Sequence, residues 1–401
     1  MVGIAGAQHM GIRSGLHGHP SSAHPFRSSP VTPQLPRRHT KKSKRLQKIQ
    51  AMAGDGIGQP TGTVISFGEA LFDCLANEKG VPKEEVKSWT PYPGGAPANV
   101  AAAIAKLNVK VAFISALGKD DLAEQMMDLL SERGVDVSGV QQVDLPTRDV
   151  LVVYDSSGDR QFVGFGGPNE SFADTAISAD KLPLEALQSA SALVTGTLGL
   201  SFPVTAAAMH KAVEAAKSGS AVVVVDVNWR PVFWDDENQA PGIILPYVSK
   251  ADIVKLSDEE AEWLFGLSAS DALQHPDKVL EQLPGVKGVL VTGGGAGCSY
   301  AFHGAGGKID YTGIVPVLKV ESTDTTGAGD AFLGGFIASL VKLGGLGALQ
   351  ADADKLRRAV EFAAACGAFT TTKPGAIGAQ PSEQDAENLL KSASFASAPA
   401  A

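Results

Sequence analysis

From Thr63 onward, short apolar runs alternate with segments of helical periodicity. The helical segments include the Ala-rich residues 96–108 and residues 120–134, which carry acids in their first turn and end at Gly134. The apolar runs are mostly continuous, as is typical of strands covered on both faces of a parallel sheet. They are residues 64–73, 109–118, 221–228, 251–257 and 288–294. This order predicts an α/β fold, a doubly wound, mostly parallel sheet between helices.

Two segments depart from this alternation. Residues 147–166 contain two extended runs around a Ser-Ser-Gly-Asp turn, which predicts a β-hairpin. Residues 74–93 are polar and interrupted by prolines. We expect these two segments to form a small β lid that projects from the main sheet.

Composition limits the classes of protein to be considered. With 401 residues, of which 44% are hydrophobic, the chain can bury a substantial core. It contains no unbroken apolar run of membrane-spanning length, so we expect no membrane partner. Its three cysteines, Cys74, Cys298 and Cys366, are far apart and lack metal-ligand spacing, which argues against disulfides and structural zinc.

Charge is distributed unevenly along the chain. Residues 1–60 hold nine Lys and Arg but one acid, whereas residues 61–401 hold 25 basic and 42 acidic residues. Such an acidic body is a poor partner for nucleic acid. The basic, Ser-containing leader resembles an organellar transit peptide, for a plastid (chloroplast) first and a mitochondrion second. A retained basic tail, and hence a cytosolic protein, is the alternative; we expect residues 61–395 to form the folded domain.

The glycine-rich segment at residues 322–340 carries the strongest chemical signal. Gly327 and Gly329 allow a tight turn, and the apolar run that follows predicts a buried helix. The free N–H groups at such a helix start can bind an anion, and Asp330 places a carboxylate beside them. This arrangement suits phosphoryl transfer to an alcohol, although a helix-capping acid would give the same pattern.

Two motifs resemble one enzyme family. The segment DTTGAGDAF (324–332) resembles the C-terminal signature of the PfkB family, which includes ribokinase, adenosine kinase and fructokinase. The segment PGGAPANVAAAIAKL (93–107) resembles the family's N-terminal signature. The resemblance covers about residues 63–391 and implies a ribokinase-like fold and an ATP-dependent carbohydrate kinase.

The resemblance also implies roles at the phosphate end of the site. Gly327, Ala328 and Gly329 would form the anion hole for the γ-phosphate, and Asp330 would be the catalytic base. Asp324, Thr326 and backbone carbonyls around Gly375 match positions that bind a K⁺ ion in many members. Turn hydrogen bonds at the end of a strand are the alternative role for Asp324 and Thr326.

For the sugar, the resemblance implies contacts from Asp73, Gly95 and Asn99, with helix capping as the alternative for Asn99. Arg160 in the hairpin would reach over the sugar. The text after it, VGFGGPNESF, departs from the usual fructokinase lid. A homodimer formed through the lid is a further expectation.

The segment KLSDEEAEWLFG (255–266) resembles the family's NxxE segment and implies a phosphate-binding role for Ser257 and Glu260. Glu260 would act on the hydrated Mg²⁺ ion; by itself it would be a solvated helix residue. Ser257 stands where many members have Asn.

The loop VTGGGAGC (291–298) lacks both the Walker A and the dinucleotide-binding glycine patterns. The resemblance to the PfkB family implies that Thr292, Gly294 and Gly297 of this loop line the ATP site. The missing dinucleotide pattern disfavours an oxidoreductase.

The segment DVNWRPVFW (226–234) bears on the choice of sugar. Its D-x-N-x-R pattern resembles fructokinases and ketodeoxygluconate kinases, and GEALFD (68–73) also resembles fructokinase. Asn228 and Arg230 would contact phosphate or sugar, or serve the strand end. We therefore expect fructose to be converted to fructose 6-phosphate. Another sugar, such as ketodeoxygluconate or ribose, and a catalytically weak plastid interaction subunit remain alternatives.

Overall fold

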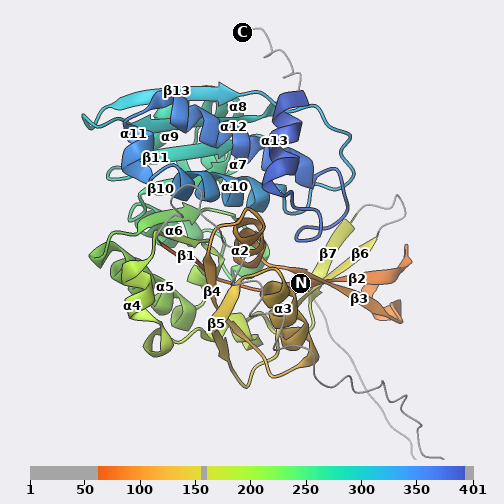
Figure 1. Ribbon diagram of the computed structural model, residues 1–401. Coiled ribbons are helices and arrows are strands. Elements are labelled where there is room, and N and C mark those ends of the chain that lie inside the picture. The colour runs from red at the N-terminus through yellow and green to blue at the C-terminus, as the bar shows by residue number, and fades with distance from the viewer. Residues whose placement is uncertain (1–61, 155–159, 393–401) are drawn as a thin grey trace, which may run out of the picture. The chain divides into compact units, whose positions relative to one another are not determined.

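The computed structural model describes residues 62–154 and 160–392, which form a nine-stranded main sheet flanked by helices (Figure 1). In sheet order the strands are β13 (Ile309–Val315), β12 (Cys298–His303), β11 (Gly288–Thr292), β10 (Ile253–Ser257), β9 (Val222–Asp226), β8 (Ala192–Thr195), β1 (Val64–Phe67), β4 (Val111–Leu117) and β5 (Asp136–Gln142). Strands β11 to β5 pair in parallel, whereas β12 and β13 form an antiparallel edge. The predicted mostly parallel sheet is confirmed.

Helices cover both faces of this sheet, because successive strand residues alternate between two cores. Val64, Val194 and Val224 belong to one core, and Ile65, Leu193 and Val225 to the other. The first core is completed by α2 (Ala96–Lys106), α3 (Asp121–Glu132), α10 (Ala328–Lys342), α11 (Leu346–Gln350), α12 (Ala353–Thr370) and α13 (Glu383–Ser392). The second is completed by α4 (Leu184–Ser189), α5 (Pro203–Ser218), α6 (Ala240–Val248), α7 (Asp258–Phe265), α8 (Ala269–Gln274) and α9 (Pro276–Glu281). The fold is therefore the expected doubly wound α/β fold.

Local sequence explains the helices that position the site. Asp120 caps α3 by accepting a hydrogen bond from the backbone N–H of Ala123 at 2.9 Å, and Gly134 follows the helix with φ 88°. Helix α10 is apolar on nearly all sides and packs against both α2 and α12. Its first turn is thereby held rigidly at the edge of the sheet.

The lid is a separate four-stranded sheet in the order β3-β2-β6-β7. Its strands are β3 (Trp89–Gly94), β2 (Leu71–Lys79), β6 (Arg148–Tyr154) and β7 (Arg160–Phe165), and they project from the main body (Figure 1). The two segments expected to form the lid thus supply its strands. The apolar run 64–73 divides between the two sheets, since β1 ends at Phe67 and β2 starts at Leu71. The expected turn at 155–159 lies outside the described residues.

The strand order of the main sheet changes direction at β1. From β1 it continues outward to β4 and β5, whereas β8, the other neighbour of β1, leads to β9, β10 and β11. Ligands of open α/β sheets bind at the carboxyl ends of the strands beside such a reversal. Within the described residues, no helix has the length and apolar character needed to cross a membrane.

Candidate active site

The first turn of α10 forms an anion-binding site at the carboxyl edge of the main sheet. Gly327 precedes the helix with φ 75°, and no side chain caps the N–H groups that follow. A Cβ atom on Gly327 would lie 2.6 Å from the Cβ atom of Ala376, so both conformation and space require glycine here. The N–H of Ala328 donates to the carbonyl oxygen of Thr325 at 3.2 Å, so the N–H groups available to a phosphate group begin at Gly329.

Asp330 lies in this turn but does not cap the helix. Its Oδ2 atom accepts a hydrogen bond from the Nδ2 atom of Asn99, on α2, at 2.8 Å. Burial raises the pKa of Asp330, while the hydrogen bond from Asn99 and the charges of Lys255 and Arg230 oppose that rise. A carboxylate with a raised pKa beside an anion site suits a general base, and the helix-capping alternative is not what the structure has.

Asn99 links the first turn of α10 to the start of α2. Its backbone carbonyl accepts a hydrogen bond from the Nε2 atom of Gln380 at 2.7 Å, which fixes the start of α2. Its own Oδ1 atom is buried without a hydrogen-bond partner among the described residues. The N-cap of α2 is Gly95, so Asn99 does not cap the helix either.

Gly95 and Asp73 lie beside this start of α2. Gly95 has φ 95°, and a Cβ atom there would lie 2.7 Å from the carbonyl oxygen of Glu69. Glycine is therefore required at position 95 because the backbone of Glu69 lies so close to it. Asp73, on β2, has its Oδ2 atom 3.3 Å from the place of a Cβ atom on Gly94. The side chain of Arg160 lies outside the described part, and its expected contact stays a prediction.

The residues expected to bind ATP follow three neighbouring strands. Asn228 comes after β9 with φ 39°, an uncommon conformation for a residue other than glycine. Arg230 donates a hydrogen bond from Nη1 to the carbonyl oxygen of Trp229 at 2.7 Å and lies near enough to Asp330 to affect its pKa. Thr292 ends β11, and Gly294 and Gly297 belong to the turn after it. These residues share the carboxyl edge with Asp330.

Ser257 and Glu260 form a capping box at the start of α7. The Oγ atom of Ser257 accepts from the N–H of Glu260 at 3.0 Å, and Glu260 Oε2 accepts from the N–H of Ser257 at 2.7 Å. Glu260 Oε1 accepts from the N–H of Trp229, which ties α7 to the segment after β9. Glu260 is buried, so its interpretation as a solvated helix residue is wrong: the carboxylate is needed to satisfy backbone donors.

The expected cation site is a set of oxygen atoms around Asp324. Its Oδ1 atom accepts from the N–H and the hydroxyl of Thr326, at 3.0 and 2.6 Å, and its Oδ2 atom accepts from the N–H of Gly375 at 2.9 Å. These bonds connect the segment before α10 to the loop after α12. These bonds agree with the alternative role in turn structure, and the K⁺ site stays a prediction.

Three buried charged residues of the site were not identified from the sequence. Lys255 and Asp226 lie inside apolar runs that read as strands, and Glu69 lies in the connection between β1 and β2. Burial raises the pKa of Asp226 to about 6 although Lys255 opposes it. Burial raises the pKa of Glu69 to about 8; the N–H of Glu69 opposes this rise, and the charges of Asp174 and Asp330 add to it. The sequence signal that could have identified these three residues is a charged residue within an apolar run.

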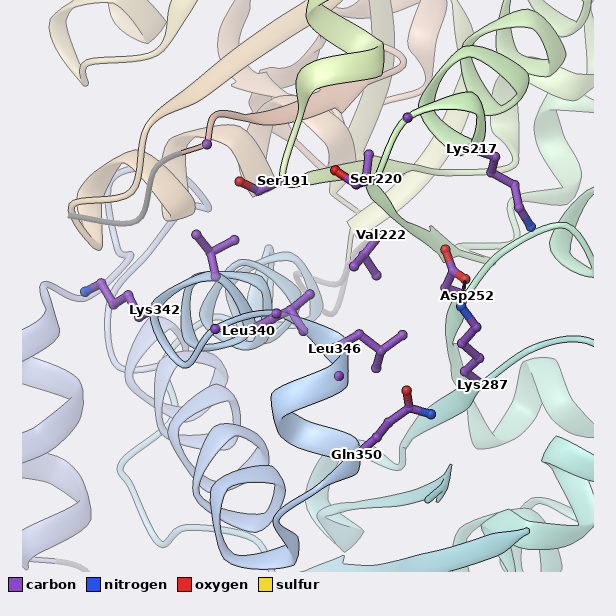
Figure 2. A pocket seen from close by; sticks show the side chains of 17 residues that line it. Ser191, Lys217, Ser220, Val222, Asp252, Lys287, Leu340, Lys342, Leu346 and Gln350 are labelled. Atoms are coloured by element: carbon purple, nitrogen blue, oxygen red, sulfur yellow. Dashed lines mark ion pairs between the residues drawn. The ribbon is translucent and has the colours of Figure 1, made fainter. Parts of the chain in front are cut away.

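A cavity of about 860 Å³ lies away from these groups, at the amino ends of the parallel strands (Figure 2). Ser191, Asp252 and Lys287, which directly precede β8, β10 and β11, line it. Lys287 forms an ion pair with Asp252 at 2.8 Å, and Lys217 donates to the carbonyl oxygen of Lys250. The groups suited to phosphoryl transfer converge at the opposite edge.

Comparison with known proteins identifies relatives over most of the chain. Residues 62–383 match the model of the pfkB family carbohydrate kinases. Fructokinase-1 of Zea mays is 37% identical over 334 residues, covering 82% of this chain and 98% of that protein. The crystal structure of a Xylella fastidiosa fructokinase with bound ATP has a TM-score of 0.72 and 28% identity, and covers 82% of this chain and 98% of that chain. A Vibrio cholerae fructokinase with fructose, ADP and calcium bound has a TM-score of 0.67 and 27% identity, covering 83% and 100%.

Proposed function

The chain belongs to the pfkB family of carbohydrate kinases and is an ATP-dependent sugar kinase, and from this premise we propose that its sugar is fructose. The observation that carries the chemistry is the Asp330 carboxylate, held by Asn99 beside the open N–H groups of α10. The similarity to fructokinases along nearly their full length supports the choice of fructose.

The geometry supports a single in-line transfer. Asp330 accepts the proton of a primary sugar hydroxyl while the oxygen attacks the γ-phosphorus of ATP. The bond from that phosphorus to the bridging oxygen breaks, and ADP leaves. The N–H groups at the start of α10, from Gly329 onward, stabilise the charge on the transferred group. The products are fructose 6-phosphate and ADP.

Mg²⁺ enters the site with ATP as part of the substrate, since this ion binds mainly to the phosphates and keeps several of its waters. Of the residues present, Glu260 fits an indirect role: its carboxylate is fixed by two backbone donors and keeps lone pairs that can accept from an ion-bound water. Asn228, Arg230 and the turn containing Gly294 and Gly297 would hold the nucleotide.

We propose a K⁺ site around Asp324, Thr326 and Gly375. Its charge would add to the positive end of α10 that the phosphate meets. Activity in potassium should exceed that in sodium at equal ionic strength, and Asp324→Ala should abolish the difference. Equal rates in both salts with wild-type protein and saturating magnesium would contradict this site.

We also propose that the lid joins two copies of the chain. Tyr92 and Phe162, two aromatic residues of the lid, are 49% and 42% exposed. Large exposed aromatic side chains are enriched at protein interfaces. Light scattering should give the mass of a dimer, and Tyr92→Ser with Phe162→Ser should give that of a monomer. A monomeric wild-type protein would exclude the dimer.

A panel of fructose, ribose, ketodeoxygluconate and adenosine with purified full-length protein tests the proposed function. Fructose should give the highest kcat/KM, with phosphate on a primary hydroxyl of the product. A preference for another compound would reject fructose but keep the kinase class. Binding of ATP without turnover of any sugar would favour the interaction subunit instead.

A further inference from the structure

Lys255 is a buried cation at the centre of the candidate active site. It lies on β10 with a side-chain exposure of 9%, and its Nζ atom is 3.0 Å from Oδ1 and 3.1 Å from Oδ2 of Asp226. Asp226 ends the neighbouring strand β9 and is equally buried, with a side-chain exposure of 5%. Burial of an ion pair is costly, so such a pair is retained where its charges serve a purpose or where the fold depends on it.

The ammonium group lies directly behind the anion-binding turn. A Cβ atom built on Gly329 would be 3.3 Å from the Nζ atom of Lys255. Burial opposes the charge on Lys255, yet the carboxylates of Asp226 and Glu260 outweigh it and raise the pKa of the ammonium. The same ammonium lowers the pKa of Asp330. One fixed positive charge therefore acts on both the proton acceptor and the phosphate site.

The groups around Asp330 differ in their charge, their burial and the hydrogen bonds they form. Asn99, from α2, donates a neutral hydrogen bond, and Arg230, after β9, is exposed to solvent. Glu69, before β2, can add only negative charge. Among these neighbours Lys255 alone combines positive charge with burial and a fixed partner.

We propose that Lys255 is a positioning residue for phosphoryl transfer, with Asp226 holding its ammonium behind Gly329. This inference rests on the proposed function and deepens it. Negative charge spreads over the phosphoryl oxygens in the transition state, and a preorganised cation in a water-poor site stabilises it without reorganisation. The same charge opposes the rise in the pKa of Asp330 and so favours the form that can accept a proton.

The alternative is that the pair only holds β9 to β10. A pair of that kind can be replaced by neutral residues with little loss, because removing both charges leaves neither buried alone. A catalytic contribution of the ammonium, in contrast, is lost whenever the charge is lost. A variant neutral at both positions therefore separates the two roles.

The test compares Lys255→Met, Asp226→Asn and the double variant Lys255→Met/Asp226→Asn with wild-type protein. With Lys255→Met we expect kcat to fall by about 10- to 100-fold, somewhat less than for loss of a direct oxyanion donor, while KM for the sugar stays within about threefold. Asp226→Asn should lower kcat less, because the ammonium is kept but no longer held. In the double variant the melting temperature should recover while kcat stays low. Lys217→Met, outside the site, controls for the substitution itself and should keep wild-type kcat.

The outcomes are distinct from those that test the proposed function. Wild-type turnover of a sugar, combined with a double variant of near wild-type kcat, would overturn the role of Lys255 and leave the kinase intact. A KM for the sugar that rises as much as kcat falls would also overturn it, since the effect would then be on binding. A wild-type protein that turns over no sugar would contradict the proposed function and this inference together.

Discussion

Burial raises the pKa of two carboxyl groups in the active site, but the groups that oppose this rise differ between them. Asp330 is buried, but Asn99, Lys255 and Arg230 all favour its ionised form. Glu69 is buried near Asp330, and its pKa of about 8 keeps it mostly neutral at pH 7. Separating the pKa values of neighbouring acids is a recurrent means of giving one of them the role of base. A neutral Glu69 avoids a second negative charge where a phosphate must bind.

Replacing Asp330 tests its role as the base. Asp330→Asn should lower kcat by about 10²- to 10⁴-fold, the usual contribution of general-base catalysis, because an amide cannot accept the proton. ATP binding and the melting temperature should change little, since the amide keeps the size of the side chain. Steady-state kinetics and calorimetry measure these quantities. Asp354→Asn on the surface of α12 is the matched control; an Asp330→Asn enzyme within a few fold of wild type would remove Asp330 from the mechanism.

Glu69 should make stability depend on pH. Its pKa is raised from 4.5 in the unfolded chain to about 8 in the fold, so the folded state holds a proton that the unfolded state releases. Stability is therefore fully present below pH 4.5 and is lost as pH rises from there to about 8, by at most about 5 kcal/mol. Glu69→Gln should flatten this part of the curve, as measured by urea unfolding at several pH values. Parallel curves for variant and wild type would show that Glu69 does not titrate there.

A buried arginine helps to join the lid to the main body. Arg148, the first residue of β6, donates from Nε to Asp174 Oδ2 at 2.7 Å and from Nη1 and Nη2 to Asn169. Its guanidinium group lies 4.6–5.3 Å from the ring centres of four phenylalanines. Of these, Phe165 belongs to the lid strand β7, whereas Phe202 and Phe233 belong to the main body. Lid and body thus share a small core around a buried ion pair.

Removing this charge should be costly to the fold. Arg148→Met leaves Asp174 buried and unpaired, so we expect a loss of about 3–5 kcal/mol in the free energy of unfolding. The double variant Arg148→Met/Asp174→Asn should regain part of the loss, because no lone charge remains. Urea unfolding measures both, and Lys119→Met, which breaks an exposed ion pair with Asp144, should have no measurable effect. A small loss for Arg148→Met would show that the phenylalanines alone hold the lid.

The chain as a whole combines a basic leader with an acidic enzyme. Residues 1–60 carry nine basic residues and one acid, whereas the remainder has a net charge of −17. The acidic remainder includes the folded kinase, and an excess of acidic residues disfavours binding to nucleic acid. We propose that the basic leader directs import into a plastid.

Import can be tested with the full chain fused at its C-terminus to a fluorescent protein. In plant cells the full chain should reach chloroplasts and be shortened before Thr63, while the chain lacking residues 1–60 should stay in the cytosol. Microscopy and the mass of the recovered protein give both results. Cytosolic fluorescence from the full chain would mean that the leader is a retained basic tail.

The sequence by itself determined the α/β order, the lid segments and the turn that precedes Asp330. These features depend on neighbours along the chain: continuous apolar runs for buried strands, helical periodicity, and glycines where a helix begins. The family resemblance, which rests on two local motifs, is confirmed by the comparison with known proteins. Most of the runs given by residue range lie within two residues of a strand or helix, whereas elements such as β8, β12 and β13 were not predicted.

Only the tertiary structure decided which charges meet. Asn99 and Asp330 are 231 positions apart, and Lys255 finds Asp226 because β9 and β10 are neighbours in the sheet. Glu260 is buried rather than solvated because backbone N–H groups at the start of α7 and after β9 need acceptors. An apolar pattern predicts which residues are buried, but it does not predict which residues they contact. A charge in an apolar run becomes interpretable once sheet order supplies its partner, since the cost of burial depends on that partner.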